Sequence, residues 1–517
     1  MTTIHPVRGQ HPDVEVGGCA VHHLALRHAA RLGDKVALLD AATGRTITYR
    51  ALAHGVERVA AGLAARGFGR GDVLAVYSPN VPDYALAVYG AMAAGGTVTG
   101  ADPSLTAGEL AGQLADAGAR LLVTAAPLLE RATDAAARAG VEEVLVFGGT
   151  FDGLVGHDLP PARVVTDPDR DIAAMPYSSG TTGLPKGVEL THAALVTNVR
   201  QALTALPYAE DDVILAVAPF CHVIGLNLLL AAGLASGATV VTLPRFDLDT
   251  FLRTIQDRRV TLSIVVPPVV RALAGHPLVD RFDLSSLRNL GVGAAPLDAA
   301  TEQRCAERLG CAVSQGLGMT ESGALIAVGD PHAPRRGSVG RLLPNTAARV
   351  VDPGSGADLG AGRTGELWVR GPQLMRGYRG RAQETAATLD ADGWLHTGDL
   401  CHFDEDGHLY VVDRLKELIK PHGHQVPPAE LELLLCTHPA VADAAVVPRP
   451  DGDAGEVPVA HVVLRSPASA EELLGYVAER VAPFKRLAAV TFTSAIPRSP
   501  TGKVLRRVLV EAERVPR

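Results

Sequence analysis

The chain has 517 residues, too many for a single hydrophobic core of ordinary size, so two or more domains are expected. Apolar residues make up 47% of the chain and charged residues 20%, a composition typical of a globular enzyme that argues against a disordered protein. The 48 basic and 56 acidic residues leave a net charge of -8 without long runs of one sign. The sequence therefore carries no basic footprint for nucleic acid.

Six cysteines lie far apart, with no His/Cys cluster at metal-ligand spacing, which favours a reduced compartment. The N-terminal stretch lacks the apolar core of a signal peptide, and no stretch reaches the roughly 18 uninterrupted apolar residues of a membrane span. We therefore expect a cytoplasmic protein with no membrane partner.

Short apolar runs alternate with Ala/Leu/Arg-rich helical stretches along the first two thirds of the chain. This alternation predicts buried strands with crossover helices, and hence an α/β fold. The predicted strands are Val73–Tyr77, Leu121–Val123, Val144–Phe147, Val213–Val217, Thr239–Leu243 and Leu262–Val266.

The pattern changes near Arg341, where Gly/Asp turns separate short strands and predict a β-rich subdomain. After Asp413 the segments AELELLLCTHP, VADAAVV, AHVVL and ELLGYVAERV predict a small α+β domain. We therefore predict a large N-terminal domain over residues 1–412 and a small, mobile C-terminal lid over residues 413–517.

The most informative stretch is Tyr177–Gly187, YSSGTTGLPKG, in which three glycines and four hydroxyl residues accompany a lysine. Small residues let backbone N–H groups curl round an anion, while the hydroxyls and Lys186 add donors and positive charge. This arrangement suits a polyphosphate. The Walker A pattern does not fit, because Gly187, not Ser or Thr, follows Lys186.

YSSGTTGLPKG resembles the signature of the adenylate-forming superfamily of acyl-CoA synthetases, peptide-synthetase adenylation domains and luciferases. Further motifs of that superfamily follow in order: GAAPL, QGLGMTE, GWLHTGD, DRLKELI and PRSPTGK. Within it the chain is most similar to 4-coumarate:CoA ligases, through PFCHVIGLN, LPRFDL, VVPPVV and PPAELE.

The resemblance implies an ATP site in which the hydroxyl-rich loop surrounds the β- and γ-phosphates. Glu321 is expected to bind Mg²⁺, because a hard cation prefers carboxylate oxygen, and Thr320 to contact the α-phosphate. Asp399 and Arg414 match the family's ribose contacts, and small residues leave a slot for adenine. The implied ATP-binding residues are Ser178, Ser179, Gly180, Thr181, Thr182, Gly183, Lys186, Gly293, Ala294, Ala295, Gly316, Leu317, Gly318, Met319, Thr320, Asp399, Arg414, Gln425 and Lys503.

The acid is expected to bind near His222, which matches the family histidine beside the acyl carboxylate; a core histidine satisfied by backbone is the competing interpretation. Ile224, Gly225 and Gly293 complete the implied pocket. Ile224 stands where coumarate ligases carry a tyrosine, which favours a more apolar acyl pocket.

The lid is expected to supply Lys503, which matches the mobile lysine that bridges the acid and the α-phosphate, and Lys420 as a further catalytic residue. Lys416 matches the family's hinge. The implied acceptor tunnel is lined by His422, Gly423 and His424. Here His422 replaces a lysine, His424 replaces an aromatic residue, and Leu317 replaces an aromatic residue that stacks on adenine.

The leading hypothesis is an ATP-dependent acid–CoA ligase that forms an aryl or arylacrylic adenylate and passes the acyl group to CoA. An ATP-dependent diazotase, in which nitrite replaces the carboxylate and an aryl amine accepts the nitrosyl group, is the rival within the fold. Loading of a carrier protein is a further option.

Overall fold

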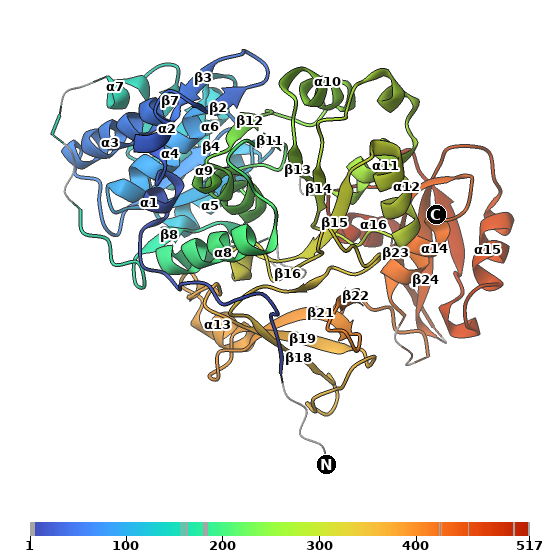
Figure 1. The fold of residues 1–517 in the computed structure, drawn as a ribbon. Coiled ribbons are helices and arrows are strands. Elements are labelled where there is room, and N and C mark those ends of the chain that lie inside the picture. Colours follow the sequence, from blue (N-terminus) through green and yellow to red (C-terminus); the bar gives the residue numbers. More distant parts are fainter. Residues whose placement is uncertain are drawn as a thin grey trace.

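The computed structural model describes residues 6–156, 159–160, 164–178, 185–422, 424, 426–452, 454–499 and 502–514. Within these residues the chain forms four sheets, three in the N-terminal part and one in the C-terminal part (Figure 1). None of the helices in the described part is both long and apolar enough to cross a membrane.

The first large sheet has eight strands in the order β20-β10-β8-β5-β4-β6-β7, with β9 paired to β10. Strands β8, β5, β4, β6 and β7 run parallel, whereas β9, β10 and β20 pair in antiparallel fashion. Every residue of β4 is buried, as expected for a parallel strand covered on both faces. The bounds are β4 (Val73–Tyr77), β5 (Thr97–Ala101), β6 (Ala119–Ala125), β7 (Glu143–Phe147), β8 (Ile172–Ala174), β9 (Tyr177–Ser178), β10 (Lys186–Thr191) and β20 (Gly377–Tyr378).

The second large sheet has nine strands in the order β17-β16-β15-β14-β13-β11-β12-β2-β3. Its centre, from β15 to β2, is parallel. The bounds are β2 (Val36–Asp40), β3 (Thr46–Thr48), β11 (Val213–Ala216), β12 (Thr239–Thr242), β13 (Leu262–Val265), β14 (Asn289–Val292), β15 (Ala312–Leu317), β16 (Ala327–Val328) and β17 (Arg341–Leu342).

Helices separate and cover the two large sheets. The inner helices contact one another and strands of both sheets: α1 (Val21–Ala25), α4 (Asp83–Ala93), α8 (His192–Ala205), the π-helical segment η2 (Ile224–Ala231) and α9 (Ala232–Ser236). The remaining helices of this part are α2 (Ala29–Leu32), α3 (Tyr49–Ala65), α5 (Ala107–Ala117), η1 (Ala126–Leu128), α6 (Leu129–Ala139), α7 (Asp152–Val155), α10 (Leu248–Arg258), α11 (Pro267–Gly275), η3 (Pro277–Arg281), α12 (Ala299–Leu309) and η4 (Thr320–Ser322).

A five-stranded sheet in the order β1-β18-β19-β21-β22 forms the β-rich subdomain. Its neighbouring strands are antiparallel, which confirms the hairpins expected after Arg341. The bounds are β1 (Val7–Arg8), β18 (Ala347–Val351), β19 (Gly365–Arg370), α13 (Ala382–Thr388), β21 (Leu395–Phe403) and β22 (Leu409–Arg414). The predicted domain boundary after residue 412 falls near the end of β22 and stays a prediction.

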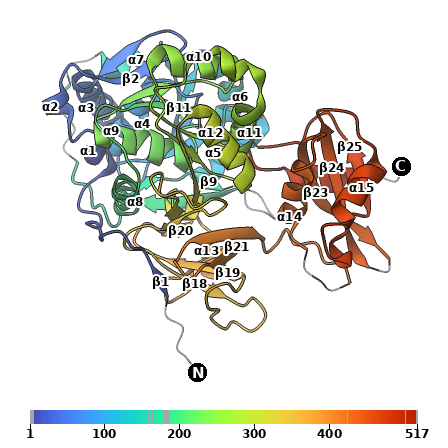
Figure 2. The ribbon, with the colours of Figure 1, turned by 45° about the vertical axis from the view of Figure 1, so that its right-hand side comes forward.

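The C-terminal part folds around its own apolar core, which includes Ile419, Leu431, Val446 and Leu473. Figure 2 shows it as a separate body beside the N-terminal part, and we call it the lid. Its elements are α14 (Pro428–Cys436), β23 (Val441–Asp451), β24 (Gly455–Leu464), α15 (Ala470–Ala478), η5 (Pro483–Lys485), β25 (Ala489–Phe492) and α16 (Arg506–Arg514). The α/β fold with a small α+β lid is confirmed; the lid's mobility stays a prediction.

Candidate functional site

The candidate site lies where parallel strands of the second large sheet end. Strands β11, β13, β14 and β15 run in one direction, so their carboxyl ends meet at one edge. Such an edge is where open α/β sheets usually bind their ligands. Loops from this edge carry His222, Gly293 and Gly318, which the sequence motifs had singled out.

His222 faces a carboxylate that the sequence did not predict. Its Nε2 lies 3.5 Å from Oδ2 of Asp102, which directly follows β5 in the other large sheet. Among the described residues, neither atom has a hydrogen-bond partner. The other oxygen of Asp102 accepts the N–H and the hydroxyl of Ser104 at 2.9 and 2.6 Å, which fixes the carboxylate. His222 is therefore part of an ion pair that joins the two large sheets.

The surroundings of His222 favour its charged form. Burial by itself lowers the pKa of the imidazole, but the neighbouring Cys221 and the carboxylate of Asp102 raise it to about 10. Burial acts to raise the pKa of Asp102, yet the neighbouring His222 and the hydrogen bonds from Ser104 lower it overall. The pair therefore consists of an imidazolium and a carboxylate at neutral pH.

The predicted acyl-pocket residues come together around the start of η2. A Cβ atom placed on Gly293 would lie 3.8 Å from Cδ1 of Ile224, so a small residue after β14 leaves space beside Ile224. A Cβ atom on Gly225 would lie 2.1 Å from the carbonyl oxygen of Pro219, so only glycine fits there. Asn80 holds the same loop by accepting the N–H of Phe220 at 2.8 Å.

The predicted adenine segments lie next to each other. Gln315 on β15 bonds the backbone of Leu297 in both directions, at 3.2 and 3.1 Å, and so ties the Gly293–Leu297 loop to the Gly316–Met319 segment. Ala294 in that loop has φ of 72°, a region that non-glycine residues rarely adopt. Strained backbone of this kind is often held at functional sites.

The rest of these segments has mixed surroundings. Gly318 admits no side chain, since its Cβ would lie 1.6 Å from the carbonyl oxygen of Ala324. Leu317, Met319, Gly316 and Ala295 are all partly buried. Leu317 and Met319 pack against the apolar core of the β-rich subdomain.

Glu321 lies in η4, directly after Thr320, and is only 6% exposed. Its Oε1 accepts a hydrogen bond of 2.8 Å from the hydroxyl of Tyr378 on β20. Burial raises the pKa of Tyr378, and the charge of Glu321 raises it further. Nζ of Lys186 lies 4.8 Å from the centre of the same ring. Tyr378 thus links the predicted phosphate lysine to the predicted metal ligand.

The hydroxyl-rich loop is bounded by a hairpin. Ser178, the last residue of β9, pairs with Lys186, the first of β10. Lys186 also forms an ion pair with Glu384 of α13. The predicted contacts Ser179, Gly180, Thr181, Thr182 and Gly183 lie outside the described residues.

Asp399 and Arg414 face each other across β21 and β22. Nε of Arg414 lies 3.1 Å from Oδ1 of Asp399, and the two residues are directly paired in the strand register. Burial raises the pKa of Asp399, while the positive charges of Arg414 and Lys503 act against it. The lid lysine therefore lies within electrostatic reach of the N-terminal part.

Lys503 is the residue through which the lid enters the site. Burial lowers its pKa, and the charge of Arg414 lowers it further, whereas Asp399, Glu321 and Glu417 raise it. A cation is thus held among carboxylates that come from β21, η4 and the turn after β22. The structure therefore brings Lys503, Asp399, Arg414 and Glu321 together.

The other predicted lid residues that the structure describes are exposed: Lys416, Lys420, His422 and His424. Lys420 donates its N–H to Glu456, His422 donates its N–H to Ala454, and Lys416 lies in the turn after β22. The ring of His424 stacks on Phe484, with 4.3 Å between ring centres. Gly423 and Gln425 lie outside the described residues. Of these side chains, that of His424 packs on the lid.

Asp102 and Tyr378 are the two site residues that sequence reasoning missed. Asp102 stands in ADPS after a β-strand, a pattern that indicates only a turn. Tyr378 stands in GYRG, where the flanking glycines likewise indicate only a turn. Each becomes notable only through a partner more than fifty residues away, His222 or Glu321.

Comparisons with known proteins agree with this geometry. The family model described as AMP-binding enzyme matches residues 26–379, and the model of the AMP-binding enzyme C-terminal domain matches residues 430–503. The 4-coumarate–CoA ligase 3 of Oryza sativa subsp. japonica is 40% identical over 97% of this chain and 94% of its own length.

Two solved structures share the fold over nearly the whole chain. ATP-bound MatB from Rhodopseudomonas palustris has a TM-score of 0.88 and 30% identity, covering 96% of this chain and 99% of its own. The amide bond synthetase McbA from Marinactinospora thermotolerans has a TM-score of 0.86 and 32% identity, covering 95% of this chain and 99% of its own.

Proposed function

Because the chain belongs to the AMP-binding enzyme family, we propose that it is an ATP-dependent acid–CoA ligase acting on an aryl or arylacrylic acid. The observation that carries the proposal is the position of Lys503. Its partly buried ammonium group has the carboxylates of Asp399 and Glu321 and the guanidinium of Arg414 as charged neighbours. A lysine in this place neutralises the negative charge that gathers when a carboxylate approaches a phosphate.

In the first half-reaction a carboxylate oxygen of the acid attacks the α-phosphorus of ATP. A new O–P bond forms, the bond from the α-phosphorus to the bridging oxygen breaks, and pyrophosphate leaves. Lys186 and the hydroxyl-rich loop would hold the β- and γ-phosphates, Thr320 the α-phosphate, and the Asp399–Arg414 pair the ribose. Gly293, Ala294 and Ala295, with Gly316, Leu317, Gly318 and Met319, would lie around the adenine.

Glu321 would hold Mg²⁺ in this scheme. Its carboxylate is buried, and within the described part of the chain the one side-chain hydrogen bond it accepts comes from the hydroxyl of Tyr378, so the donor type fits a hard cation. When bound, Mg²⁺ would supply neutralising charge for the phosphates. The hydroxyl of Tyr378 would orient the carboxylate through its hydrogen bond, as residues hydrogen-bonded to a metal ligand commonly do.

His222 would hold the carboxylate of the acid. Its Asp102 partner keeps the imidazole charged, so it can donate a hydrogen bond to an anion near the attack position. Ile224 and the side-chain-free Gly293 border the space beyond, and neither provides a hydrogen-bonding side chain. The pocket therefore favours an aryl group without a para-hydroxyl.

In the second half-reaction the thiolate of CoA attacks the acyl carbonyl, a C–S bond forms, and AMP leaves with the C–O electron pair. The relatives named 4-coumarate–CoA ligase support CoA as the acceptor. His422 and His424 would border its path, and Lys420 would act from the same loop. The diazotase alternative gains no support from the comparisons reported above, and a carrier protein remains an arm of the acceptor test.

The proposal is tested by incubating the protein with ATP, Mg²⁺ and single acids, then measuring pyrophosphate and thioester. Cinnamate-type and benzoate-type acids are compared with and without a para-hydroxyl, each with CoA, with a carrier protein, with an amine and with nitrite plus an aminoaryl acid. We expect acid-dependent pyrophosphate release and a CoA thioester, with acids lacking the hydroxyl turned over faster. Amide, diazo or carrier-bound products without any thioester would overturn the choice of acceptor, and no pyrophosphate release with any acid would overturn the proposed function.

A further inference from the structure

Lys503 reaches the site from the lid, so something must hold the lid against the N-terminal part. An ion pair crosses that boundary: Nη2 of Arg271 on α11 lies 3.7 Å from Oδ1 of Asp443 on β23. The Arg271 side chain is 19% exposed and the Asp443 side chain 23%. The pair is therefore partly shielded from water. Its attraction is weakened less by solvent than that of a fully exposed pair.

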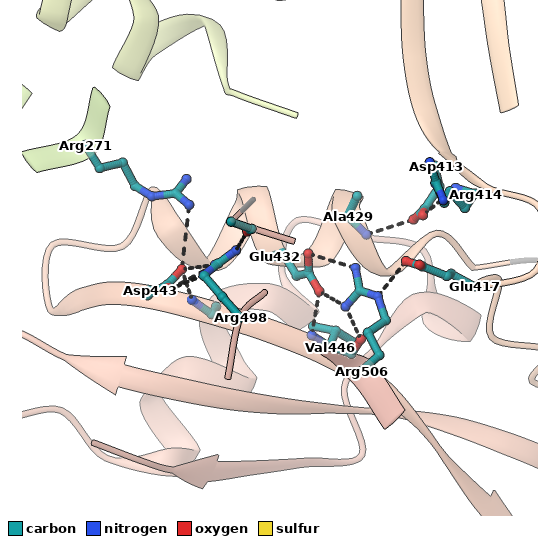
Figure 3. Close-up of polar contacts among 12 residues, drawn as sticks. Arg271, Asp413, Arg414, Glu417, Ala429, Glu432, Asp443, Val446, Arg498 and Arg506 are labelled. Atoms are coloured by element: carbon teal, nitrogen blue, oxygen red, sulfur yellow. Dashed lines mark hydrogen bonds and ion pairs between the residues drawn. The ribbon is translucent and has the colours of Figure 1, made fainter. Parts of the chain in front are cut away.

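Asp443 continues the contact toward Lys503. Nη2 of Arg498 donates to both carboxylate oxygens of Asp443, at 2.8 and 2.9 Å, and Nε donates at 3.3 Å. Nη1 of the same guanidinium donates to the carbonyl oxygen of Gly502 at 2.9 Å. Gly502 directly precedes Lys503, so Arg498 connects the lid's acidic group to the backbone that carries the lysine. Figure 3 shows Arg271 reaching from α11 toward Asp443, with Arg498 on the other side of that carboxylate.

The residue before Lys503 also lies close to the N-terminal part. Gly502 has φ of +79°, and a Cβ atom placed on it would lie 3.0 Å from Cβ of Val266, the residue before α11. The start of α11 and the residue before Lys503 are therefore close neighbours. Arg271 and Val266 are the two residues of the N-terminal part that these contacts involve. Both belong to the short stretch that begins just before α11.

A second arginine cluster is internal to the C-terminal part and to the turn that joins it to β22. Nε of Arg506 on α16 donates to Glu417 at 2.6 Å, and its Nη1 donates to Glu432 and to the carbonyl oxygen of Val446, the latter at 2.9 Å (Figure 3). These bonds join α16, α14 and β23, so the lid forms one packed unit. A contact at Asp443 is therefore transmitted to the loop of Lys503.

We propose that Arg271 is a positioning residue for adenylation, which holds the lid through Asp443 and Arg498 in the place where Lys503 reaches the site. The inference rests on the proposed function for its kinetic consequence. Arg271 contacts neither ATP nor the acid in this scheme, and acts only through Asp443.

The test compares Arg271→Gln and Arg271→Glu with Arg271→Lys in two assays. Adenylation is followed as acid-dependent pyrophosphate exchange, and the second half-reaction as thioester formation from a preformed acyl-adenylate and CoA. We expect Arg271→Gln to lower the exchange rate about threefold to fivefold, and Arg271→Glu, which repels Asp443, on the order of tenfold. Arg271→Lys restores most of the exchange, the KM for ATP stays within about twofold, and the second half-reaction is unaffected.

Hydrogen exchange gives a readout that needs no activity. Amides of α11 are expected to exchange faster in Arg271→Gln than in the unaltered protein, because the docked lid shields them. The control is Arg349→Gln, which removes a similarly shielded Arg–Asp pair, with side chains 24% and 29% exposed, inside the β-rich subdomain. Arg349→Gln should change neither the ratio of the rates of the two half-reactions nor the rate of amide hydrogen exchange in α11.

Equal losses of rate in both half-reactions would overturn the positioning role. So would an unchanged rate of amide hydrogen exchange in α11 of Arg271→Glu. If the unaltered protein shows no pyrophosphate exchange with any acid, the proposed function fails, while the hydrogen-exchange comparison still decides whether Arg271 docks the lid.

Discussion

The ammonium group of Lys503 is partly buried, and its charged neighbours come from both parts of the chain. Asp399 and Glu321 raise its pKa, whereas burial and Arg414 lower it. A buried cation is costly unless it has partners. We infer that this cost is offset most when phosphate and carboxylate groups of the substrates enter the site.

Replacing Lys503 by alanine is expected to abolish adenylation and spare the second half-reaction. The expected loss in acid-dependent pyrophosphate exchange is on the order of 10² to 10³, by analogy with removal of one preorganised donor. Thioester formation from a preformed acyl-adenylate should change little. If both half-reactions fall to the same extent while circular dichroism shows an intact fold, the assigned role is wrong.

The carboxylate of Asp102 is expected to control the charge of His222. In Asp102→Asn the amide oxygen can still accept the Ser104 hydrogen bonds, but the negative charge is lost. Burial then lowers the pKa of His222 with less opposition, because the contribution of Asp102 is gone and that of Cys221 remains. We predict that the KM for the acid rises about tenfold at neutral pH, the cost of one charge-assisted hydrogen bond, as measured by initial rates at varied acid.

The direction of the pH dependence follows from the same pair. The folded pKa of His222, about 10, lies above its ordinary value of 6.5, so the pair contributes its full stabilisation below pH 6.5 and loses it as the pH rises toward 10. The KM for the acid should therefore begin to rise at a lower pH in Asp102→Asn than in the unaltered protein. Tyr84 and Cys221 also face this group, and neither is changed. Asp40→Asn, which alters another strand-end turn, is the control; coincident profiles for Asp102→Asn and the unaltered protein would refute the role of Asp102.

At the scale of elements, the strands were predictable and the partners between elements were not. Val73–Tyr77 was predicted with the bounds that β4 has, because an apolar run covered on both faces leaves a clear pattern. The π-helical form of η2 was not predicted, since its composition is equally that of an α-helix. The Asp102–His222 pair joins two sheets, and no local sequence pattern predicts such a contact.

The loop between β22 and α14 is the element that bears on the acceptor. His422 has φ of 50°, is exposed, and stands where the resemblance implies a lysine, while His424 stacks on Phe484. Exchanging His422 for Lys and His424 for Phe would place a permanent charge and an aromatic ring there.

We predict that the double variant lowers the KM for CoA about threefold, the order expected for one added surface charge near an anion. The rate of pyrophosphate exchange should not change, because the adenylation residues are untouched. Saturation curves for CoA with a preformed acyl-adenylate check this. An unchanged KM would show that this loop does not border the CoA path.

At the scale of the whole molecule, the sequence motifs predicted the parts of the site but not the state of the lid. The motifs carry Asp399, Glu321 and Lys503 at wide intervals, and the docked lid brings the charge of Lys503 to the two carboxylates of the N-terminal part. Docking depends on contacts such as Arg271–Asp443, whose two residues lie outside every motif. Such contacts use ordinary surface residue types, so the sequence offers no signal for them.

The central claim is that a carboxylate oxygen of the substrate attacks the α-phosphorus of ATP. The most direct measurement uses an acid labelled with ¹⁸O in both carboxylate oxygens, incubated with ATP, Mg²⁺ and CoA, followed by mass spectrometry of the nucleotide product. The account predicts AMP that carries one ¹⁸O atom, with pyrophosphate unlabelled. Unlabelled AMP, or ADP in place of AMP, would contradict it.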